Sequence, residues 1–302
     1  MNSSLVPHQE SGPGSGVKSI FSVDVEDWFH ILDITAAPQL VAWDRLPSRV
    51  ERNFRRLLDL FGENGIRVTC FFLGWVAQQH PQLVKKAVSE GHEVASHGYA
   101  HRLVYQMTAQ EFRKDAIHSR KLLEDISGTP VEGFRSAGFS TTEHTPWFFD
   151  ALAEAGYRYD SSVFPAARGH GGMRNGHREP HWVLGRNKSL LLEFPISVID
   201  FAGKPMCFFG GGYLRLFPYW LVERMAKRVI SEGRPVVFYI HPREIDPEHP
   251  RLPMPLSRHF KTYVNLSSTE GKIVRILRRF PLTTFRDFIA QERNWSTVSY
   301  AA

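Results

Sequence analysis

The chain has only two cysteines among its 302 residues, Cys70 and Cys207. Both lie in apolar, strand-like runs, where cysteine usually serves as a small buried hydrophobe, so we expect no disulfide framework. The chain also lacks a run of about 18 apolar residues, the length that a membrane span needs. Residues 1–16 carry no apolar core of a secretory signal. We therefore expect a cytoplasmic protein without stable membrane insertion, preceded by a disordered tail over residues 1–18.

Neither sign of charge dominates the sequence, because 37 Lys and Arg face 31 Asp and Glu, a net charge of +6. The densest basic run, residues 275–279, belongs to a pattern in which apolar and basic residues alternate as on an amphipathic helix with a solvated face. A nucleic-acid binder would gather its cations on one stripe, and here acids and bases are interspersed. We expect no nucleic-acid partner, and a basic nucleic-acid binder is kept only as an alternative.

The apolar share of 42% and the charged share of 23% are those of a globular protein. Short apolar runs alternate with helical periodicity from residue 20 onward, which is typical of βα units. We predict an α/β fold, a distorted (β/α) barrel of seven or eight parallel strands over residues 19–241, with a C-terminal extension over residues 242–302 packed on it. The predicted strands are 19–25, 68–73, 92–96, 131–135, 157–161, 190–195, 235–240 and 283–285, the predicted helices are 47–62, 81–90, 108–126, 145–155, 218–232 and a basic helix around 272–279, and 166–180 is predicted as a long loop.

Polar residues recur at the ends of the predicted strands. In a parallel barrel these ends lie on one rim, where the reactive groups of such folds sit. A charged group directly after an apolar strand is costly to bury unless it is paired or bound to a metal. The recurrence therefore predicts a functional site on this rim, built from Asp24, Glu26, Asp27, His97, His101, Arg135, Asp160 and His241.

Two histidines of this set are spaced as metal ligands. His97 and His101 are four apart, which on one helical turn would put both rings on the same side. The spacing alone is a weak signal, because His177 and His181 share it. Two histidines with one carboxylate and open positions would make a catalytic metal site rather than a structural one.

The acidic cluster after the first strand can supply that carboxylate. Asp24 and Glu26 share one face of an extended strand, whereas Asp27 falls where the chain leaves it. One acid can bind the metal while a second takes a proton from a water activated by the ion. The alternative is that these acids cap a helix or lie on the surface beside Trp28. His241, between a strand and Pro242, is a candidate general acid or else a buried structural histidine.

Taken together, five segments within residues 20–241 resemble a polysaccharide deacetylase of carbohydrate esterase family 4, with its nodulation-type deacetylase domain. The segments are Asp24-Val25-Glu26-Asp27, His97-Gly98-Tyr99-Ala100-His101, Gly133-Phe134-Arg135-Ser136-Ala137-Gly138, Tyr159-Asp160-Ser161-Ser162 and Phe238-Tyr239-Ile240-His241. The chain departs from the family at Ala137, where proline is usual, and in having Asp-x-Glu-Asp where the family has two adjacent Asp.

The resemblance implies a role for each matching residue. Asp24 would be the catalytic base, Arg135 would orient it, and His241 would be the general acid. One of Glu26 and Asp27 would bind the metal with His97 and His101, and the departure in the first segment leaves open which one. The ion would be Zn first, with Co, Mn or Fe as alternatives.

The implied activity is the hydrolysis of N-acetyl groups on the amino sugars of a polysaccharide or oligosaccharide, in exopolysaccharide or cell-envelope glycan metabolism. Aromatic residues near the rim are expected to stack on sugar rings. Two other functions stay open, a small cyclic amide hydrolase on the same barrel and a non-catalytic glycan-binding protein. The expected substrate-binding residues are Trp28, Tyr99, Phe139, Asp160 and Tyr213.

Residues 242–291 are similar to the C-terminal extension of a subgroup found with exopolysaccharide loci of exosortase-bearing bacteria. The run from Gly210 to Arg215 is also typical of that subgroup. Its glycines would either let backbone amides approach a sugar or phosphate or form a plain flexible turn.

Overall fold

The computed structural model describes residues 16–32, 34–167, 171–291 and 294–300. The predicted disordered tail falls almost entirely on residues 1–15, which lie outside the described residues. The predicted strands are present with ends shifted by up to two residues, and four further strands occur. The strands are β1 (Ser19–Val25), β2 (Thr69–Phe72), β3 (Glu93–Ser96), β4 (Gly133–Phe134), β5 (Tyr159–Asp160), β6 (His181–Leu184), β7 (Leu190–Glu193), β8 (Ile199–Phe201), β9 (Lys204–Met206), β10 (Val237–Ile240), β11 (Leu282–Thr283) and β12 (Ser296–Val298).

The main sheet has the strand order β10-β1-β2-β3-β4-β5-β7-β6-β12. Every pair from β10 to β7 is parallel, so seven parallel strands run side by side. The sheet continues through β6, antiparallel to β7, while β11 pairs with β1 off this path. The prediction of an α/β fold with seven or eight parallel strands is thereby confirmed.

Side-chain and backbone hydrogen bonds link the two ends of the parallel run. The Ser197 hydroxyl, just beyond β7, accepts from the Val237 amide of β10 at 2.9 Å and donates to the Pro235 carbonyl at 3.2 Å. On the same strand the Tyr239 amide donates to the Phe209 carbonyl at 3.2 Å. These bonds curve the sheet toward closure as a distorted barrel.

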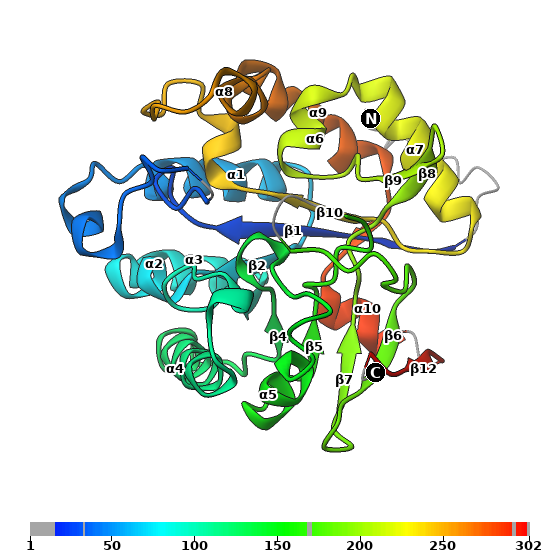
Figure 1. Ribbon diagram of the computed structural model, residues 1–302. Coiled ribbons are helices and arrows are strands. Elements are labelled where there is room, and N and C mark those ends of the chain that lie inside the picture. The colour runs from blue at the N-terminus through cyan, green and yellow to red at the C-terminus, as the bar shows by residue number, and fades with distance from the viewer. Residues whose placement is uncertain (1–15, 33, 168–170, 292–293, 301–302) are drawn as a thin grey trace, which may run out of the picture.

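Helices cover the outside of this sheet. Figure 1 shows α6 to α9 together beyond β1 and β10, with α2 to α5 on the opposite side of these strands. The α4 helix begins as its sequence predicts, because Thr108 and Glu111 form a reciprocal capping box. The helices are α1 (Val50–Glu63), α2 (Gly74–Gln79), α3 (Pro81–Ser89), α4 (Ala109–Ser127), α5 (Phe148–Glu154), α6 (Gly211–Leu216), α7 (Tyr219–Ser231), α8 (Leu256–Tyr263), α9 (Leu266–Arg279) and α10 (Phe285–Gln291), with 3₁₀ turns at Leu40–Arg45, Val104–Gln106, Ala137–Phe139 and Pro242–Ile245.

Two apolar clusters stabilise the fold. The larger one lies between the sheet and the outer helices, where Phe54, Leu57 and Phe61 of α1 are completely buried. The smaller one fills the inside of the barrel and includes Phe71 of β2 and Phe194. Burying one side chain of this size stabilises the folded state by about 2 to 3 kcal/mol.

The end of the described chain completes the barrel interior. Phe285, the first residue of α10, is 0% exposed, and its ring stacks on Tyr159 with centroids 5.2 Å apart. The predicted strand over residues 283–285 is therefore shorter than expected, because β11 ends at Thr283 and Phe285 turns into the core. The boundary between barrel and extension after residue 241 stays a prediction.

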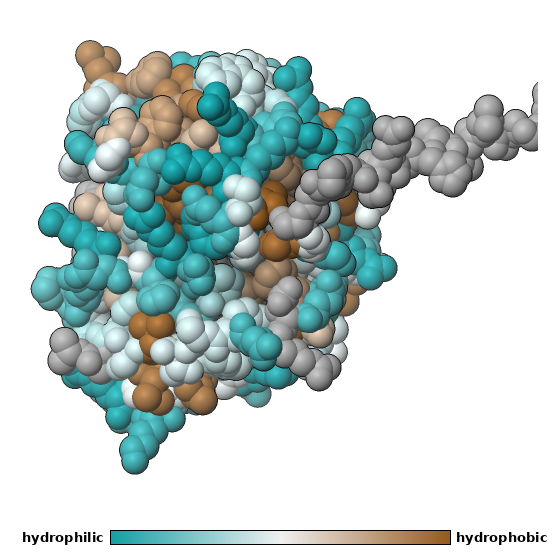
Figure 2. Space-filling view, turned by 90° about the vertical axis from the view of Figure 1, so that its right-hand side faces the viewer, coloured by the Kyte–Doolittle hydropathy of each residue, from teal (hydrophilic) through white to brown (hydrophobic). Residues whose placement is uncertain are grey.

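The face seen in Figure 2 is mostly hydrophilic, with apolar residues in scattered patches. Scattered apolar surface of this kind is usual for globular proteins. Within the described residues, no helix is both long and apolar enough to cross a bilayer.

Candidate active site

Three ligand-type side chains meet at the carboxyl ends of β1 and β3. Glu26, His97 and His101 are all buried, and one potential ligand atom of each lies within 4.8 Å of the others. His101 Nε2 is 2.8 Å from Glu26 Oε2, yet this oxygen has no hydrogen-bond partner. A buried carboxylate oxygen facing an imidazole nitrogen without a hydrogen bond fits a shared cation, and two histidines with one carboxylate is a donor set that Zn²⁺ accepts.

The tautomer of His97 suits this arrangement. Its Nδ1 lies 2.8 Å from the Arg135 carbonyl oxygen. A carbonyl can only accept, so Nδ1 carries the hydrogen and Nε2 keeps its lone pair toward the cluster. Burial lowers the pKa of His97 to about 4, so that the ring is neutral at pH 7.

The two histidines converge through a loop and not through the helical turn that the sequence interpretation assumed. Residues 97–101 contain no helix, and the backbone has φ of 74° at Gly98 and 52° at His101. The loop is held by the Tyr99 amide, which donates to Asp115 Oδ2 at 3.1 Å. Positive φ at both positions reverses the chain tightly enough to bring the second ring back beside the first.

The structure separates the neighbouring acids Glu26 and Asp27. Asp27 points away from the histidines and accepts from the backbone amides of Arg49 at 2.9 Å and Val50 at 3.2 Å, at the start of α1. The Ser48 hydroxyl also donates to it at 2.6 Å. Asp27 thus serves the helix-capping role that the sequence left as an alternative, and it does not reach the cluster because the chain leaves the strand there.

Asp24 lies beside the cluster and is held by a buried ion pair. Arg135 Nη1 donates to Asp24 Oδ1 at 2.7 Å and to the Ser22 hydroxyl at 2.8 Å. Arg135 is 0% exposed, and its guanidinium lies 4.1 Å from the centre of the Phe71 ring. Arg135 does not line the pocket, and among the candidate catalytic residues it contacts Asp24 directly.

His241 completes the group from the end of β10. Its Nε2 lies 3.8 Å from Asp24 Oδ2 and 3.6 Å from Glu26 Oε1. On the other side, Nδ1 is 3.3 Å from Oε1 of Glu244, which is itself paired with Arg215. Burial lowers the pKa of His241, but the charges of Glu26 and Glu244 outweigh it and raise the pKa above the usual value. These two carboxylates therefore favour the protonated form of the ring.

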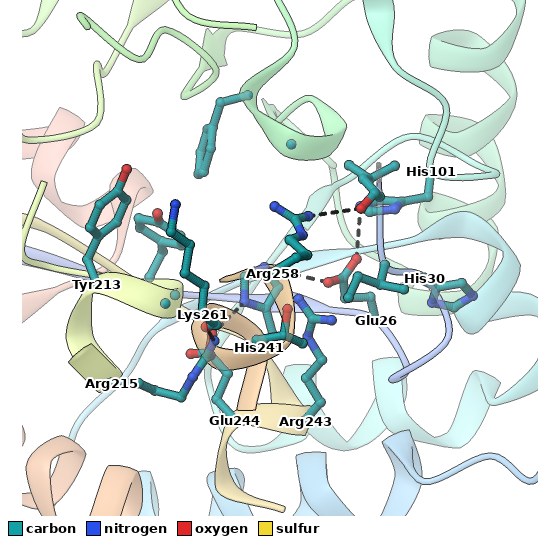
Figure 3. A pocket seen from close by; sticks show the side chains of 18 of the residues that line it. Glu26, His30, His101, Tyr213, Arg215, His241, Arg243, Glu244, Arg258 and Lys261 are labelled. Carbon is teal, nitrogen blue, oxygen red and sulfur yellow. Dashed lines mark hydrogen bonds and ion pairs between the residues drawn. The ribbon is translucent and has the colours of Figure 1, made fainter. Parts of the chain in front are cut away.

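Glu26, His97, His101 and His241 line one pocket of about 410 Å³, shown in Figure 3. Phe139 and Tyr213, two of the expected substrate-binding residues, line it. The full lining is Glu26, His30, Ile31, Leu32, His97, Gly138, Phe139, His101, Gly211, Gly212, Tyr213, Arg215, Leu216, Tyr239, His241, Arg243, Glu244, Arg258, Lys261 and Thr262.

The other three expected substrate-binding residues do not line this pocket. Trp28 is only 5% exposed, and its Nε1 donates to the Pro47 carbonyl at 3.0 Å. The hydroxyl of Tyr99 donates to Gln78 at 2.6 Å, so this ring packs on α2. Asp160 is completely buried. These three side chains make contacts within the fold. Their sequence positions beside strand ends do not indicate this.

Asp160 instead belongs to a buried polar cluster behind the site. It accepts from the Ser162 hydroxyl at 2.6 Å, and it is paired in register with Glu193 of β7. Burial raises the pKa of Asp160 to about 6, and burial together with the neighbouring acid raises the pKa of Glu193 well above its usual value. Asp160 is therefore a structural residue at the exit of β5.

The glycine run begins α6 and is not a flexible turn. A Cβ at Gly210 would stand 2.2 Å from Cδ1 of Tyr239, so only glycine permits this approach of the two segments. Gly211 has φ of 52° and lies on the pocket wall. The close packing on Tyr239 explains the glycine at 210.

Several pocket residues escaped the sequence interpretation. Glu244 could have been found, because Pro242 starts a 3₁₀ turn that places it against His241 three positions back. Arg258 and Lys261 come from α8. Their arrival at the pocket depends on tertiary packing and has no local signal.

The fold and the site together define an α/β-barrel protein with a candidate two-histidine, one-carboxylate metal site. Residues 38–159 match the polysaccharide deacetylase family, and residues 161–290 match a domain of unknown function, DUF3473. A peptidoglycan deacetylase of Helicobacter pylori is 30% identical over 108 residues, covering 36% of each chain. Residues 38–159 therefore carry a polysaccharide deacetylase domain.

Solved structures agree on the fold. An allantoinase (PuuE) superposes with a TM-score of 0.59 at 16% identity, covering 95% of this chain and 96% of the other. A probable polysaccharide deacetylase of Pseudomonas aeruginosa superposes with a TM-score of 0.56 at 16% identity, covering 89% and 88%. The chain spans less than half the length of three curated relatives that it matches, with shares of 36%, 26% and 46%.

Proposed function

We propose that the protein is a metal-dependent hydrolase that removes N-acetyl groups from the amino sugars of a polysaccharide or oligosaccharide. One observation carries the proposal: the Glu26, His97 and His101 cluster shares a pocket with His241 and lies beside the Asp24–Arg135 pair. The relative from Helicobacter pylori, a peptidoglycan deacetylase, supports the same chemistry.

Glu26, His97 and His101 would hold the metal, with Zn²⁺ as the first choice and Co, Mn or Fe as alternatives. A bound ion of this kind polarises a carbonyl and lowers the pKa of a water molecule toward neutrality. With three protein ligands, a bound ion would keep coordination positions for water or substrate, as catalytic rather than structural sites do.

Asp24 is the general base of the proposed reaction. Its Oδ1 is held by Arg135 at 2.7 Å, so Oδ2, on the side of His241, is the oxygen that takes a proton from the attacking water. The fixed orientation reduces the entropy that the proton transfer would otherwise cost.

His241 is the general acid. It faces the same cluster, and its second nitrogen lies beside Glu244, which favours the protonated ring. When the tetrahedral adduct collapses, Nε2 donates its proton to the departing amine nitrogen and acetate leaves. The general base and the general acid therefore act from β1 and β10, neighbouring strands of the sheet.

Phe139 and Tyr213 on the pocket wall would stack on sugar rings. The biological context we propose is exopolysaccharide or cell-envelope glycan metabolism in the cytoplasm, in keeping with the resemblance of residues 242–291 to the exosortase-linked subgroup.

The test measures acetate released from N-acetylglucosamine oligomers by zinc-loaded protein, beside the ring opening of allantoin. Acetate release without allantoin opening supports the deacetylase. Allantoin opening without acetate supports the cyclic amide hydrolase instead. Binding of the oligomers with neither reaction would support a non-catalytic glycan-binding protein.

A further inference from the structure

We propose that the pocket contains a subsite for an anionic oxygen group, so that the substrate is an N-acetylated amino sugar bearing a carboxylate or phosphate. This inference rests on the proposed function and narrows its substrate class. The subsite is formed by Arg243, Arg258 and Lys261, which all come after β10 in sequence and line the same pocket as Glu26, His97 and His101.

Cations exceed acids on the pocket wall. Arg215, Arg243, Arg258 and Lys261 line it, against the acids Glu26 and Glu244. Both acids are already engaged, Glu26 with the histidines and Glu244 with Arg215 and His241.

Arg243 is the strongest element of this argument. Its Nη1 is buried without a hydrogen-bond partner, and no ion pair joins its side chain to any residue that the structure describes. A buried guanidinium N–H without an acceptor is costly unless a ligand supplies one. The charge of Arg243 also contributes to lowering the pKa of Glu26 and of Glu244, which places it close to the reacting groups.

The other two cations approach from α8. Arg258 Nη2 donates to the Leu32 carbonyl at 2.9 Å, which ties α8 to the chain that follows β1. The backbone carbonyl of Lys261 accepts from Arg215 at 2.9 Å, while its side chain is exposed. In Figure 3 the side chain of Arg258 extends above Glu26 and His241, and that of Lys261 extends into the pocket on the side of Tyr213. Three cations from two segments thus surround a space next to the acetyl-processing groups.

Two kinds of substrate carry such a group beside an N-acetyl sugar. One is an acidic sugar with a carboxylate, and the other is a sugar phosphate, as in a glycan precursor attached through phosphate. Arginine binds both well because its planar N–H groups match the paired oxygens of either anion.

The test measures dissociation constants by calorimetry with zinc-loaded protein. The probes are N-acetylglucosamine as the neutral reference, N-acetylmuramic acid as the carboxylate, and N-acetylglucosamine 1-phosphate as the phosphate. The variants are Arg243→Gln and Lys261→Gln, with Arg224→Gln as a matched control, since Arg224 is an exposed residue of α7 outside the pocket.

We expect at least one anionic probe to bind about tenfold or more tightly than the neutral sugar. This preference falls roughly tenfold in Arg243→Gln, falls less in the more exposed Lys261→Gln, and is unchanged in Arg224→Gln. The anionic probe whose affinity falls more in Arg243→Gln identifies the carboxylate or the phosphate as the natural group. If Arg243→Gln does not fold, Lys261→Gln carries the comparison, because its side chain is on the surface.

Equal affinity for neutral and anionic probes overturns the subsite. So does a preference that survives in both pocket variants, because the anion would then be held elsewhere, for example by the metal alone. Acetate measured in the same samples separates the two proposals: release from the neutral sugar without an anionic preference keeps the function and rejects the subsite. An anionic preference lost in the variants, without acetate release from any probe, keeps the subsite and rejects the deacetylase.

Discussion

At the scale of single residues, the neighbouring acids at the end of β1 make different contacts. Asp24 is fixed by Arg135, Glu26 faces two histidines, and Asp27 caps α1. Alternation along the strand explains why Asp24 and Glu26 share a face, and the chain's exit explains why Asp27 does not. Three carboxylates within four residues therefore lie in three different environments.

The base assignment predicts that Asp24→Asn abolishes turnover while the metal stays bound. The amide keeps the shape of the side chain but cannot take the proton, so kcat falls by at least about 10² to 10⁴. Acetate release and metal content by mass spectrometry check the two halves. Near-normal turnover in this variant would remove Asp24 from the role.

The two neighbouring acids give a matched pair of variants. Glu26→Gln should weaken metal binding strongly and leave the fold intact. Asp27→Ala should keep the metal and lower the free energy of unfolding by about 1 to 2 kcal/mol, the usual effect of losing a helix cap. Metal titration and urea denaturation of both proteins test this. The reverse pattern, with metal lost only in Asp27→Ala, would exchange their assignments.

The sequence marked candidate metal ligands, but it did not predict the geometry that brings them together. Histidines four apart beside a strand end marked His97 and His101 as candidates. That they meet through a loop with positive φ at Gly98 depends on how the chain packs around Asp115, a contact distant in sequence.

At the scale of elements, hydrophobic periodicity predicted the alternation of strands and helices. It did so because most strands are buried on both faces, whereas most outer helices bury only one face. The hairpin of β8 and β9 and the helix α8 were missed. Strand β9 is not buried, and Leu256 and Phe260 of α8 are exposed, so neither element shows the pattern of a core segment. Local sequence signals such as the Thr108 cap predicted helix starts correctly, because the interacting residues lie within one helical turn.

The junction of α3 and β3 predicts a pH dependence of stability. The Val68 amide donates to Nδ1 of buried His92 at 3.1 Å, and burial lowers the pKa of His92 from 6.5 to about 4. Between these values the unfolded chain binds more protons, so stability is complete above pH 6.5 and declines as the pH falls toward 4. The decline attributable to His92 is up to about 3 kcal/mol.

Urea denaturation of the wild type and of His92→Asn across pH 4 to 7 measures this contribution. The variant is expected to lose less stability than the wild type over the window. Parallel curves for the two proteins would show that His92 does not contribute.

At the scale of the whole molecule, the C-terminal segment is part of both the core and the pocket. Phe285 packs inside the barrel against Tyr159, and α8 supplies two cations to the pocket wall. Sequence patterns indicated an extension beyond residue 241 but could not show these contacts, because they join positions more than a hundred residues apart. The family resemblance predicted the polar residues at the strand ends. It did not predict the residues of the pocket wall, because tertiary packing brings them together.

This arrangement predicts that a chain ending at residue 281 is not stably folded. Phe285→Ala alone should cost about 3 to 5 kcal/mol of unfolding free energy, because it empties a fully buried site. Leu256→Ala is the control, since Leu256 is 88% exposed and its loss should change stability by less than about 0.5 kcal/mol. A stable, active chain of 281 residues would show instead that the barrel is complete without β11 and α10.

The central claim is that Glu26, His97 and His101 hold a metal on which deacetylation depends. The most direct measurement is acetate release from N-acetylglucosamine oligomers by chelated protein, by the same protein reloaded with zinc, and by His97→Ala. Our account predicts activity in the reloaded wild type alone, and one metal per chain that His97→Ala fails to retain. Equal acetate release by the chelated protein, or by His97→Ala, would contradict it.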